Sequence, residues 1–225
     1  MSALTTRILV LGVVDIFGPA NGYQLRRELL SWEVERWAHL NPGSIYSMLT
    51  TLEKQGAIER HDIALEDGGR PVAVYTITDA GSAEFQNLVF DAIATVPDSG
   101  DALPLRVALN FGPVMRRSRF LAAVRARVEV LTMGREIVVQ KQSYLKESRS
   151  VPPHVSSELG LEIALIDAQL GWLEQLDGEV SAGGLDFADD ARHGEGWTPA
   201  ADDPGWHMAA ERDRYAARIA EQRRA

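Results

Sequence analysis

Apolar residues recur at helical spacing in two segments near the start of the chain. Residues 5–17 (TTRILVLGVVDIF) are apolar on most sides, which is typical of a helix buried between neighbours, and a Gly-Pro pair follows them. In the next segment, from Gly22 to Trp32, Leu25 and Leu29 share one face with Trp32. The pattern therefore predicts two helices that both contribute to a core.

The segment 41–56 carries signals for both ends of a third helix. Asn41 is a good N-cap, Pro42 fits the first helical position and Gly56 fits the C-terminal stop. Together they predict a helix of about 14 residues with two different faces. The apolar face comprises Ile45, Met48, Leu49 and Leu52, and the opposite, small and polar face comprises Gly43, Ser47, Thr50 and Lys54.

A short polar face of this kind suits the major groove of DNA, which is about 12 Å wide, because small side chains let the helix backbone approach the base edges. Tyr46 lies between the two faces, so its ring can pack while its hydroxyl remains free to form a hydrogen bond. An ordinary amphipathic surface helix would show the same pattern. The segments that follow favour the DNA-binding interpretation.

Two β-rich runs, residues 57–63 and 72–77, flank a polar turn that contains Gly-Gly. They predict a hairpin with a long tip. Arg70 at this tip could enter a minor groove, where A·T stretches concentrate negative potential, or it could be a solvated turn residue. The neighbouring Glu66 and Asp67 weaken the case for insertion.

A fourth long helix should follow the hairpin, with Thr78 as its cap and Asp79 placed favourably against the helix dipole. Helix, helix, capped helix, hairpin, helix is the element order of a winged helix-turn-helix. We therefore expect a mainly α protein with a small β-hairpin, in which residues 1–96 form a winged helix-turn-helix DNA-binding domain. The apolar stripe of the fourth helix, which is core or dimer interface, comprises Phe85, Leu88, Val89, Ala92, Ile93 and Val96.

The second half of the chain predicts a linker at 97–104 and a helical dimerisation domain at 105–178. A short apolar helix at 105–111 should precede two long helices with matching 3-4 apolar spacing, separated by a turn at 148–154. These helices could pack only on each other in a monomer, or they could bring two copies together, which would present two reading helices to two half-sites. The expected dimerisation residues are Leu121, Val124, Val128, Leu131, Val138, Leu159, Ile163, Ile166, Leu170 and Leu173.

Residues 179–225 predict an irregular tail that could end in a helix over 207–224. Trp197 and Trp206 are unusual for simple disorder, so they could dock on the body, or the tail could be loosely attached.

Net charge complicates the DNA-binding interpretation. The whole chain carries −9, and residues 1–82 hold seven Lys and Arg against ten Asp and Glu, a net charge of −3. Any contact with DNA must therefore come from local clustering of cations, and we expect modest affinity with strong salt dependence. The same acidity keeps an alternative open, a winged-helix module that binds protein instead of DNA.

Other function classes lack support in the sequence. The chain has no cysteine, and its five histidines show no metal-ligand spacing, so we expect no metal site. It also lacks a glycine-rich phosphate loop and a nucleophile elbow, so we expect neither an enzyme nor a bound cofactor. No run of 18 apolar residues occurs, which predicts no membrane partner and a cytoplasmic protein.

Four patches of the sequence resemble the PadR family, the phenolic acid decarboxylase regulators. The third and fourth are the specific ones, because their order and spacing are hard to obtain by chance. The patches are Ile8 to Gly12 before Gly18-Pro19; Gly22-Tyr23-Gln24-Leu25; Pro42 to Tyr46 with Leu49, Leu52, Glu53 and Gly56; and Gly69-Arg70-Pro71 with Tyr75 to Thr78 and Gly81. Glu158 to Leu161 and Trp172 to Glu174 resemble the C-terminal helical domain of longer members more weakly, and the tail has no counterpart.

This resemblance implies a dimeric repressor that binds double-stranded DNA, reads the major groove with its third helix and touches the minor groove or backbone with its wing. It also implies a small aromatic or lipophilic effector that releases the DNA. The residues expected to contact DNA are Gly43, Ser44, Tyr46, Ser47, Thr50, Lys54 and Arg70. Aromatic side chains that could form an effector pocket, or that could simply be core, are Trp32, Trp37, Phe85, Phe90 and Trp172.

Overall fold

The computed structural model describes residues 3–64, 70–97, 100–189 and 205–224, with side chains for all of these except 205–210. Contacts between residues divide the described chain into two compact units. Unit 1 comprises the described residues of Met1–Val89, Leu103–Phe111 and Gly194–Ala225, and unit 2 those of Phe90–Ala102 and Gly112–His193.

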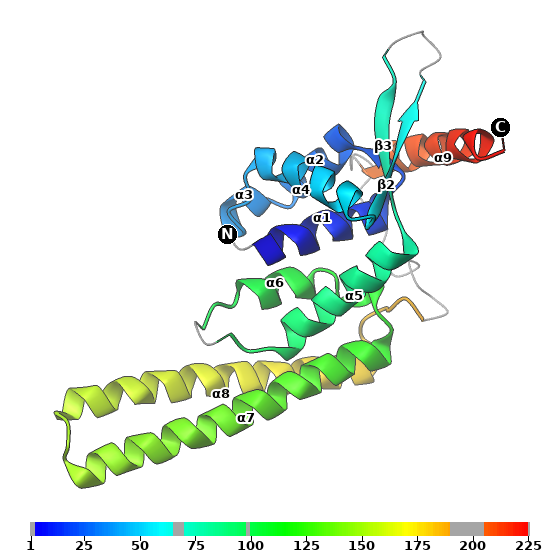
Figure 1. The fold of residues 1–225 in the computed structure, drawn as a ribbon. Helices are drawn as coiled ribbons and strands as arrows, with labels where there is room; N and C mark the ends of the chain where they lie inside the picture. The colour runs from blue at the N-terminus through cyan, green and yellow to red at the C-terminus, as the bar shows by residue number, and fades with distance from the viewer. Residues whose placement is uncertain (1–2, 65–69, 98–99, 190–204, 225) are drawn as a thin grey trace. The chain divides into compact units, whose positions relative to one another are not determined.

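Unit 1 contains most of the helices and all the strands of the described chain (Figure 1). Its elements are α1 (Ala3–Phe17), β1 (Ala20–Asn21), α2 (Gly22–Ser31), α3 (Val34–Trp37), α4 (Pro42–Lys54), β2 (Ile58–Ile63), β3 (Val72–Ile77), most of α5 (Asp79–Ala94), α6 (Leu103–Leu109) and α9 (Gly205–Gln222).

Helix α1 is the centre of the unit 1 core, as its continuous apolar composition predicts. Ile8, Leu9 and Leu11 are fully buried. Gly12 faces the ring of Phe111, which follows α6, and a Cβ at this position would lie 2.3 Å from that ring. The absence of a side chain at Gly12 therefore lets α1 and the end of the α6 segment approach closely.

The hairpin β2–β3 forms as expected, but it belongs to a three-stranded antiparallel sheet of order β1-β3-β2. Val74 of β3 lies opposite His61 of β2 on one side and Asn21 of β1 on the other. The two-residue β1 is too short to show a period-2 pattern, so the sequence analysis missed it, and it also missed the four-residue α3.

Thr78 caps α5, as predicted. Its hydroxyl oxygen accepts a hydrogen bond from the Gly81 amide at 3.0 Å and donates to the Gly56 carbonyl at 2.8 Å. This one side chain ties the start of α5 to the end of α4. The sequence of helices and hairpin in unit 1 is that of a winged helix-turn-helix, which confirms the predicted fold class of a mainly α protein with a small β-hairpin.

Unit 2 consists mainly of two long helices, α7 (Arg117–Ser148) and α8 (Pro153–Ser181), preceded by a 3₁₀ turn, η1 (Gly112–Val114). The two helices pack on each other, and ion pairs join Arg125 to Asp177 at 2.8 Å and Arg135 to Asp167. Of the residues expected to mediate dimerisation, the buried ones are Val124, Leu131, Val138, Leu159 and Leu173, and the half-buried ones are Leu121, Val128, Ile163, Ile166 and Leu170. The buried members of the two seams therefore pack within one chain, and the part of the half-buried members in dimerisation stays a prediction.

Element boundaries in the second half differ in detail from those expected. Helix α6 starts at Leu103, inside the segment expected to be a linker, and residues 103–111 belong to unit 1. Helix α8 continues to Ser181, into the segment expected to be an irregular tail. The C-terminal helix α9 forms and belongs to unit 1, while Trp197 and the side chain of Trp206 lie outside the described residues.

Across the described residues, no helix combines the length and the apolar character that crossing a membrane requires. Within the same residues, no three His, Asp or Glu side chains lie close enough together to hold a metal ion.

Candidate nucleic-acid interface

Helix α4 has the caps that its sequence predicts. The Asn41 side chain accepts a hydrogen bond from the Gly43 amide at 2.9 Å, and Pro42 occupies the first turn. At the other end Gly56 has a φ of +73°, which a residue with a side chain rarely adopts. The two caps fix the length and therefore the register of the helix.

The faces of α4 are also as predicted. Ile45, Leu49 and Leu52 are buried in the core of unit 1. The outer face is solvent-exposed and consists of Gly43, Ser47, Thr50 and Lys54.

Hydroxyl groups on α4 are held by the helix itself. Ser47 Oγ donates to the Gly43 carbonyl at 3.1 Å, and Thr50 Oγ1 donates to the Tyr46 carbonyl at 3.1 Å. Such backbone contacts contribute little to helix stability, and a hydroxyl can rotate toward an external partner without leaving a buried group unpaired. The outer face is thus able to offer donors and acceptors to a ligand such as a base edge.

The two flanks of α4 differ. Tyr46 is 44% exposed and lies against the start of α2, where a Cβ on Gly22 would be 3.0 Å from its ring. Ser44 lies on the other flank, in a shallow hollow that Thr6 and Thr51 also line. Gly43 and Ser47 of the outer face line the same hollow, so Ser44 continues the polar face of α4 toward the N-terminus of α1.

The start of α2 is a part of this surface that the sequence analysis did not assign. Asn21 and Gln24 form a capping box, in which the Gln24 amide donates to Asn21 Oδ1 at 2.9 Å and the Asn21 amide donates to Gln24 Oε1 at 2.8 Å. Tyr23 beside them is 62% exposed. The spacing of Asn21 and Gln24 is typical of a helix start and could have predicted where α2 begins. That prediction would have added the start of α2, with the exposed Tyr23, to the expected surface.

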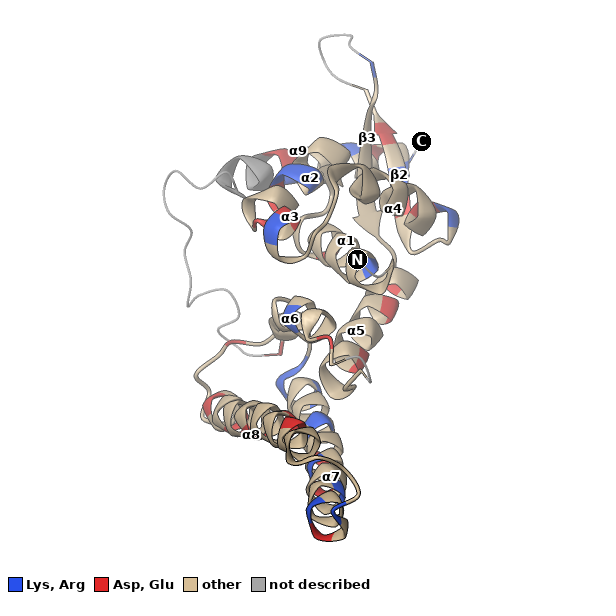
Figure 2. Ribbon diagram, turned by 90° about the vertical axis from the view of Figure 1, so that its left-hand side faces the viewer, with Lys and Arg blue, Asp and Glu red and all other residues tan. Residues whose placement is uncertain are grey.

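The hairpin contributes little free positive charge. Arg70 is exposed just before β3, while Glu66 and Asp67 lie outside the described residues. Arg60 is paired with Asp62 at 2.9 Å. Figure 2 shows Lys and Arg on α2 and α4 as two short stretches, which are Arg26-Arg27 followed by Glu28 and Lys54 preceded by Glu53.

The aromatic residues expected to form one effector pocket are divided between the two units. In unit 1, Trp32 and Phe85 both pack on Phe111, with ring centroids 5.9 Å and 5.3 Å away, as part of the core. In unit 2, Phe90 lies under the guanidinium of Arg119, and Trp172 is 42% exposed on α8. Trp37, in unit 1, lies under Arg106.

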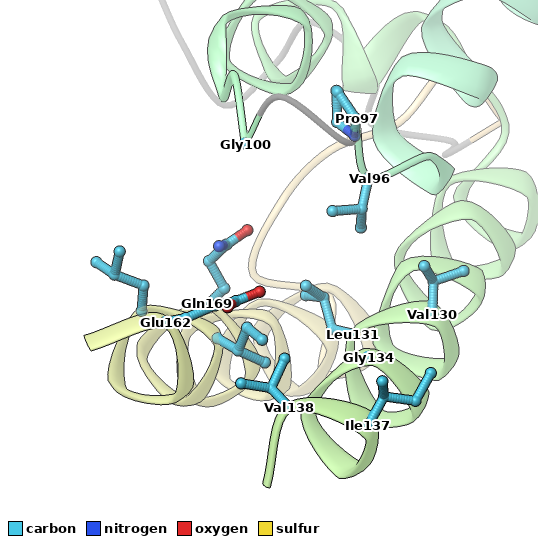
Figure 3. Close-up of a pocket in the computed structure, with 12 residues that line it drawn as sticks. Val96, Pro97, Gly100, Val130, Leu131, Gly134, Ile137, Val138, Glu162 and Gln169 are labelled. Atoms are coloured by element: carbon cyan, nitrogen blue, oxygen red, sulfur yellow. The ribbon is translucent and has the colours of Figure 1, made fainter. Parts of the chain in front are cut away.

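Unit 2 has a different cavity, of about 470 Å³, between the segment after α5 and the helices α7 and α8 (Figure 3). Leu131, Val138 and Ile166 line it together with the polar groups of Glu162 and Gln169, and none of the expected aromatic residues does so. Mostly apolar walls with a few polar groups are typical of small-molecule sites.

Comparison with known proteins identifies the N-terminal part of the chain. Residues 10–87, which include α2, α4 and the hairpin, match the family described as "Transcriptional regulator PadR-like family". This segment is PadR-like. The match confirms the resemblance based on the sequence patches and leaves α7, α8 and α9 outside the PadR-like segment.

Solved structures similar to this chain include smu.1604c from Streptococcus mutans, with 19% identity and a TM-score of 0.35, covering 78% of this chain and 98% of that one. The PadR-like transcriptional regulator BC1756 from Bacillus cereus has 21% identity and a TM-score of 0.33, covering 79% and 99%. PadR from Bacillus subtilis, solved in complex with operator DNA, has 17% identity and a TM-score of 0.35, covering 77% and 98%. None of the curated proteins matches the chain.

Proposed function

We propose that this protein is a transcriptional regulator that binds double-stranded DNA as a homodimer, acts as a repressor and is released by a small aromatic or lipophilic effector. The observation that carries the proposal is the exposed, small and polar outer face of the doubly capped helix α4, located in the PadR-like segment. In this proposal α4 enters the major groove, and Ser47, Thr50 and Lys54 contact base edges or nearby phosphates.

The low positive charge around α4 determines the affinity and the salt dependence that we expect for DNA binding. Few cations surround α4, so the electrostatic attraction is local and the acidic remainder of the chain repels the duplex. Affinity should therefore be modest, its logarithm should fall with the logarithm of salt by about 0.9 for each phosphate contact, and specificity should depend strongly on the polar contacts of α4.

Two exposed threonines offer a matched test. Thr132 Oγ1 on α7 donates to the Val128 carbonyl at 2.8 Å, the same type of contact that Thr50 makes in α4, but Thr132 belongs to unit 2 and lies outside the PadR-like segment. We expect Thr50→Ala to weaken binding to the selected sequence by about 1–3 kcal/mol and Thr132→Ala to change it little. The measurement is fluorescence anisotropy on a duplex that the wild-type protein selects from a random pool, with a scrambled competitor.

The alternative, a winged-helix module that binds protein, gives a different result. Such a module would select no sequence from the pool, and a triple change of Ser47, Thr50 and Lys54 to alanine would leave whatever weak DNA binding remains unaltered. Sequence selection by the wild-type protein that disappears in the triple variant supports the DNA-binding regulator.

The dimer in this proposal uses a surface other than the α7–α8 seam. Ile137 on α7 and Leu165 on α8 are 66% and 57% exposed, and both line the same cavity of unit 2. Exposed apolar side chains that neighbour each other commonly mark an interface. A second copy docked on this side would supply the second reading helix that two half-sites about 34 Å apart require.

The unit 2 cavity is the place we propose for the effector, in place of the aromatic cluster expected from the sequence. Titrating phenolic and polycyclic compounds into the protein–DNA complex should lower the anisotropy at constant salt if one of them is an effector. A flat response across the panel would remove the effector from the proposal and leave DNA binding untouched.

A further inference from the structure

Helix α9 packs on one face of the hairpin. Ile219 is buried against Ile63 and Val74, and Tyr215 and Val72 surround this small apolar cluster. Because α9 lies outside residues 10–87, it adds to the PadR-like segment a helix that the family match does not include.

Polar contacts fix the direction in which α9 crosses the sheet. Near its beginning, Glu211 contacts Gln24, and Tyr215 accepts a hydrogen bond from Asn21 Nδ2 at 3.2 Å, so this part lies at the start of α2. Near its end, Gln222 Nε2 donates to the Asp62 carbonyl at 3.1 Å, so this part has reached the outer strand β2.

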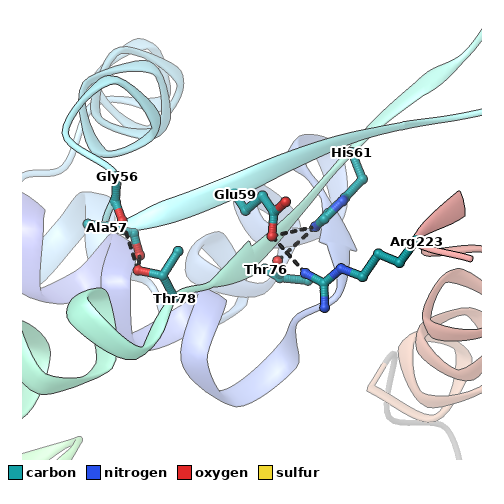
Figure 4. Close-up of polar contacts among 7 residues, drawn as sticks. All are labelled: Gly56, Ala57, Glu59, His61, Thr76, Thr78 and Arg223. Atoms are coloured by element: carbon teal, nitrogen blue, oxygen red, sulfur yellow. Dashed lines mark hydrogen bonds and ion pairs between the residues drawn. The ribbon is translucent and has the colours of Figure 1, made fainter. Parts of the chain in front are cut away.

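Arg223, which follows α9, shows which flank of the helix faces the base of the hairpin, the end where β2 begins and β3 ends. The guanidinium of Arg223 donates to Glu59 at 2.8 Å, and Figure 4 shows this contact beside His61 and Thr76. Glu59 lies three residues before Asp62 on a strand that runs toward the tip. Arg223 therefore extends toward the base.

Helical spacing then places the other arginines. With Tyr215 and Gln222 facing the sheet, a rotation of 100° per residue puts Arg212 on the flank shared with Arg223, and puts Arg214 and Arg218 on the opposite flank, toward the tip. Arg214 is exposed, and no hydrogen bond or ion pair joins it to another described residue. Arg218 lies 3.3 Å from Glu221 and remains partly exposed.

We propose that Arg214 binds a backbone phosphate of the duplex beside the hairpin, so that α9 forms a second, sequence-independent part of the DNA interface. The inference rests on the proposed function, because it assumes that the duplex lies across α4 and the hairpin. Figure 1 shows α4 and α9 on opposite sides of the hairpin, so a duplex that lies on α4 and crosses the hairpin would reach α9 on the far side.

Charge supports this assignment. On the hairpin Arg60 is already paired with Asp62, and Arg223, which directly follows α9, pairs with Glu59 and so neutralises one of the acidic residues of β2. Arginine suits phosphate because its planar guanidinium donates several hydrogen bonds to the phosphate oxygens while it keeps its charge. The cations that the acidic hairpin lacks are thus supplied by a helix distant in the sequence.

The test compares charge reversals on the two flanks of α9 in the full chain. Arg214→Glu should lower the slope of log affinity against log salt by about 1 and weaken binding to specific and scrambled duplexes alike, because each phosphate contact releases about 0.9 counterion. Arg212→Glu, on the base-facing flank, carries the same change of charge and should leave the slope at its wild-type value. Hydroxyl-radical footprinting should show protection beyond the hairpin in wild type that is lost in Arg214→Glu.

Thermal unfolding of both variants should match wild type, since both side chains are exposed. An equal loss of affinity in the two variants would indicate general repulsion and overturn the inference, as would an unchanged slope and footprint in Arg214→Glu. If the wild-type protein shows no salt-dependent, competitor-resistant binding to any duplex, the proposed function itself fails. If wild type binds and Arg214→Glu binds equally well, only the inference about α9 fails.

Discussion

Gly81 is a position where only the smallest residue fits. It lies in the first turn of α5, and a Cβ there would lie 1.9 Å from the Ala57 carbonyl oxygen, a backbone atom that cannot rotate away. We expect Gly81→Ala to lower the free energy of unfolding by about 2–4 kcal/mol, because α5 must shift away from the start of the hairpin. Urea denaturation followed by circular dichroism measures this.

Gly171 provides the control for that substitution. It lies within α8, and nothing lies within 4 Å of a Cβ added there. Gly171→Ala should raise the free energy of unfolding by about 0.5–1 kcal/mol, because alanine loses less backbone entropy in a helix. Equal effects of the two substitutions would contradict the close approach at Gly81.

His61 predicts a pH dependence of stability. It is 8% exposed under α9, its Nε2 lies 2.9 Å from Thr76 Oγ1, and Glu59 and Arg223 face it. Burial lowers the pKa of His61 below its ordinary 6.5, Glu59 opposes this shift and Arg223 adds to it. The unfolded chain therefore binds a proton more readily, so the stabilisation is present above the ordinary pKa and is lost as the pH falls from there toward the lowered value.

Replacing this side chain should remove that part of the pH dependence. The free energy of unfolding of wild type should fall more steeply than that of His61→Gln between about pH 7 and pH 5, as measured by urea denaturation at each pH. Parallel curves for the two proteins would show that His61 titrates normally in the folded state.

The predictability of single residues depended on whether their signal is local. Asn41 and Gly56 were identified because caps act on the backbone beside them, and Thr78 for the same reason. Glu59, the partner of Arg223, is 164 residues away in the sequence, and a local sequence pattern cannot predict such a contact.

At the scale of elements, the C-terminus of α5 is joined to α7 through a buried arginine. Arg127 is 2% exposed, and its guanidinium donates to the Thr95 carbonyl at 2.6 Å, to the Ile93 carbonyl at 3.2 Å and to Gln169 at 3.3 Å. Carbonyls at the end of a helix lack partners within it and carry partial negative charge, so a cation is favoured there. The arginine thus makes the end of α5 and the pair α7–α8 interdependent.

Removing this side chain should be costly. Arg127→Met leaves buried carbonyls without donors, and we expect the free energy of unfolding to fall by about 2–4 kcal/mol. Arg125→Met, two residues earlier, removes an exposed ion pair with Asp177 and should cost at most about 1 kcal/mol. A smaller effect at Arg127 than at Arg125 in urea denaturation would sink this interpretation.

Long periodic elements could be predicted and short or weakly amphipathic ones could not. The stripes of α1, α4, α5, α7 and α8 are long enough to define a period, whereas β1 and α3 are not. Helix α9 was expected, but its docking on the hairpin was not, because Tyr215 and Ile219 alone make only a weak apolar face. The place of a helix with so few apolar residues depends on polar partners elsewhere in the chain.

At the scale of the whole molecule, the chain is not divided into consecutive domains. Unit 1 takes residues from the beginning, the middle and the end of the chain, and unit 2 is inserted between them. From the sequence, consecutive segments with boundaries at the 97–104 linker and at residue 178 were expected, because composition changes there. Amino-acid composition indicates where a segment is exposed or turns. The units are defined by contacts, and some of these join residues more than a hundred positions apart, such as Glu59 and Arg223.

The proposed dimer predicts that exposed apolar side chains of α7 and α8 become buried when two copies associate. A side chain such as Ile137 or Leu165 that is largely exposed in one chain contributes little to folding of that chain, but its burial by a second copy would remove apolar area from water. We expect the double variant Ile137→Glu and Leu165→Glu to weaken dimerisation at least about tenfold, because dimerisation would have to bury unpaired carboxylates. Sedimentation velocity over a range of protein concentrations measures this, and affinity for a duplex with two half-sites should fall with it.

Gln140→Glu is the matched control, since Gln140 is an exposed polar residue of the same helix that does not line the unit 2 cavity. It should sediment as wild type does. If the double variant also sediments as wild type, the two copies meet elsewhere. If wild type is monomeric at micromolar concentration, the regulator reaches two half-sites only by assembling on the DNA. A variant that loses the dimer yet keeps the wild-type unfolding curve would assign the exposed side chains to association, because the seam between α7 and α8 already accounts for the folding of unit 2.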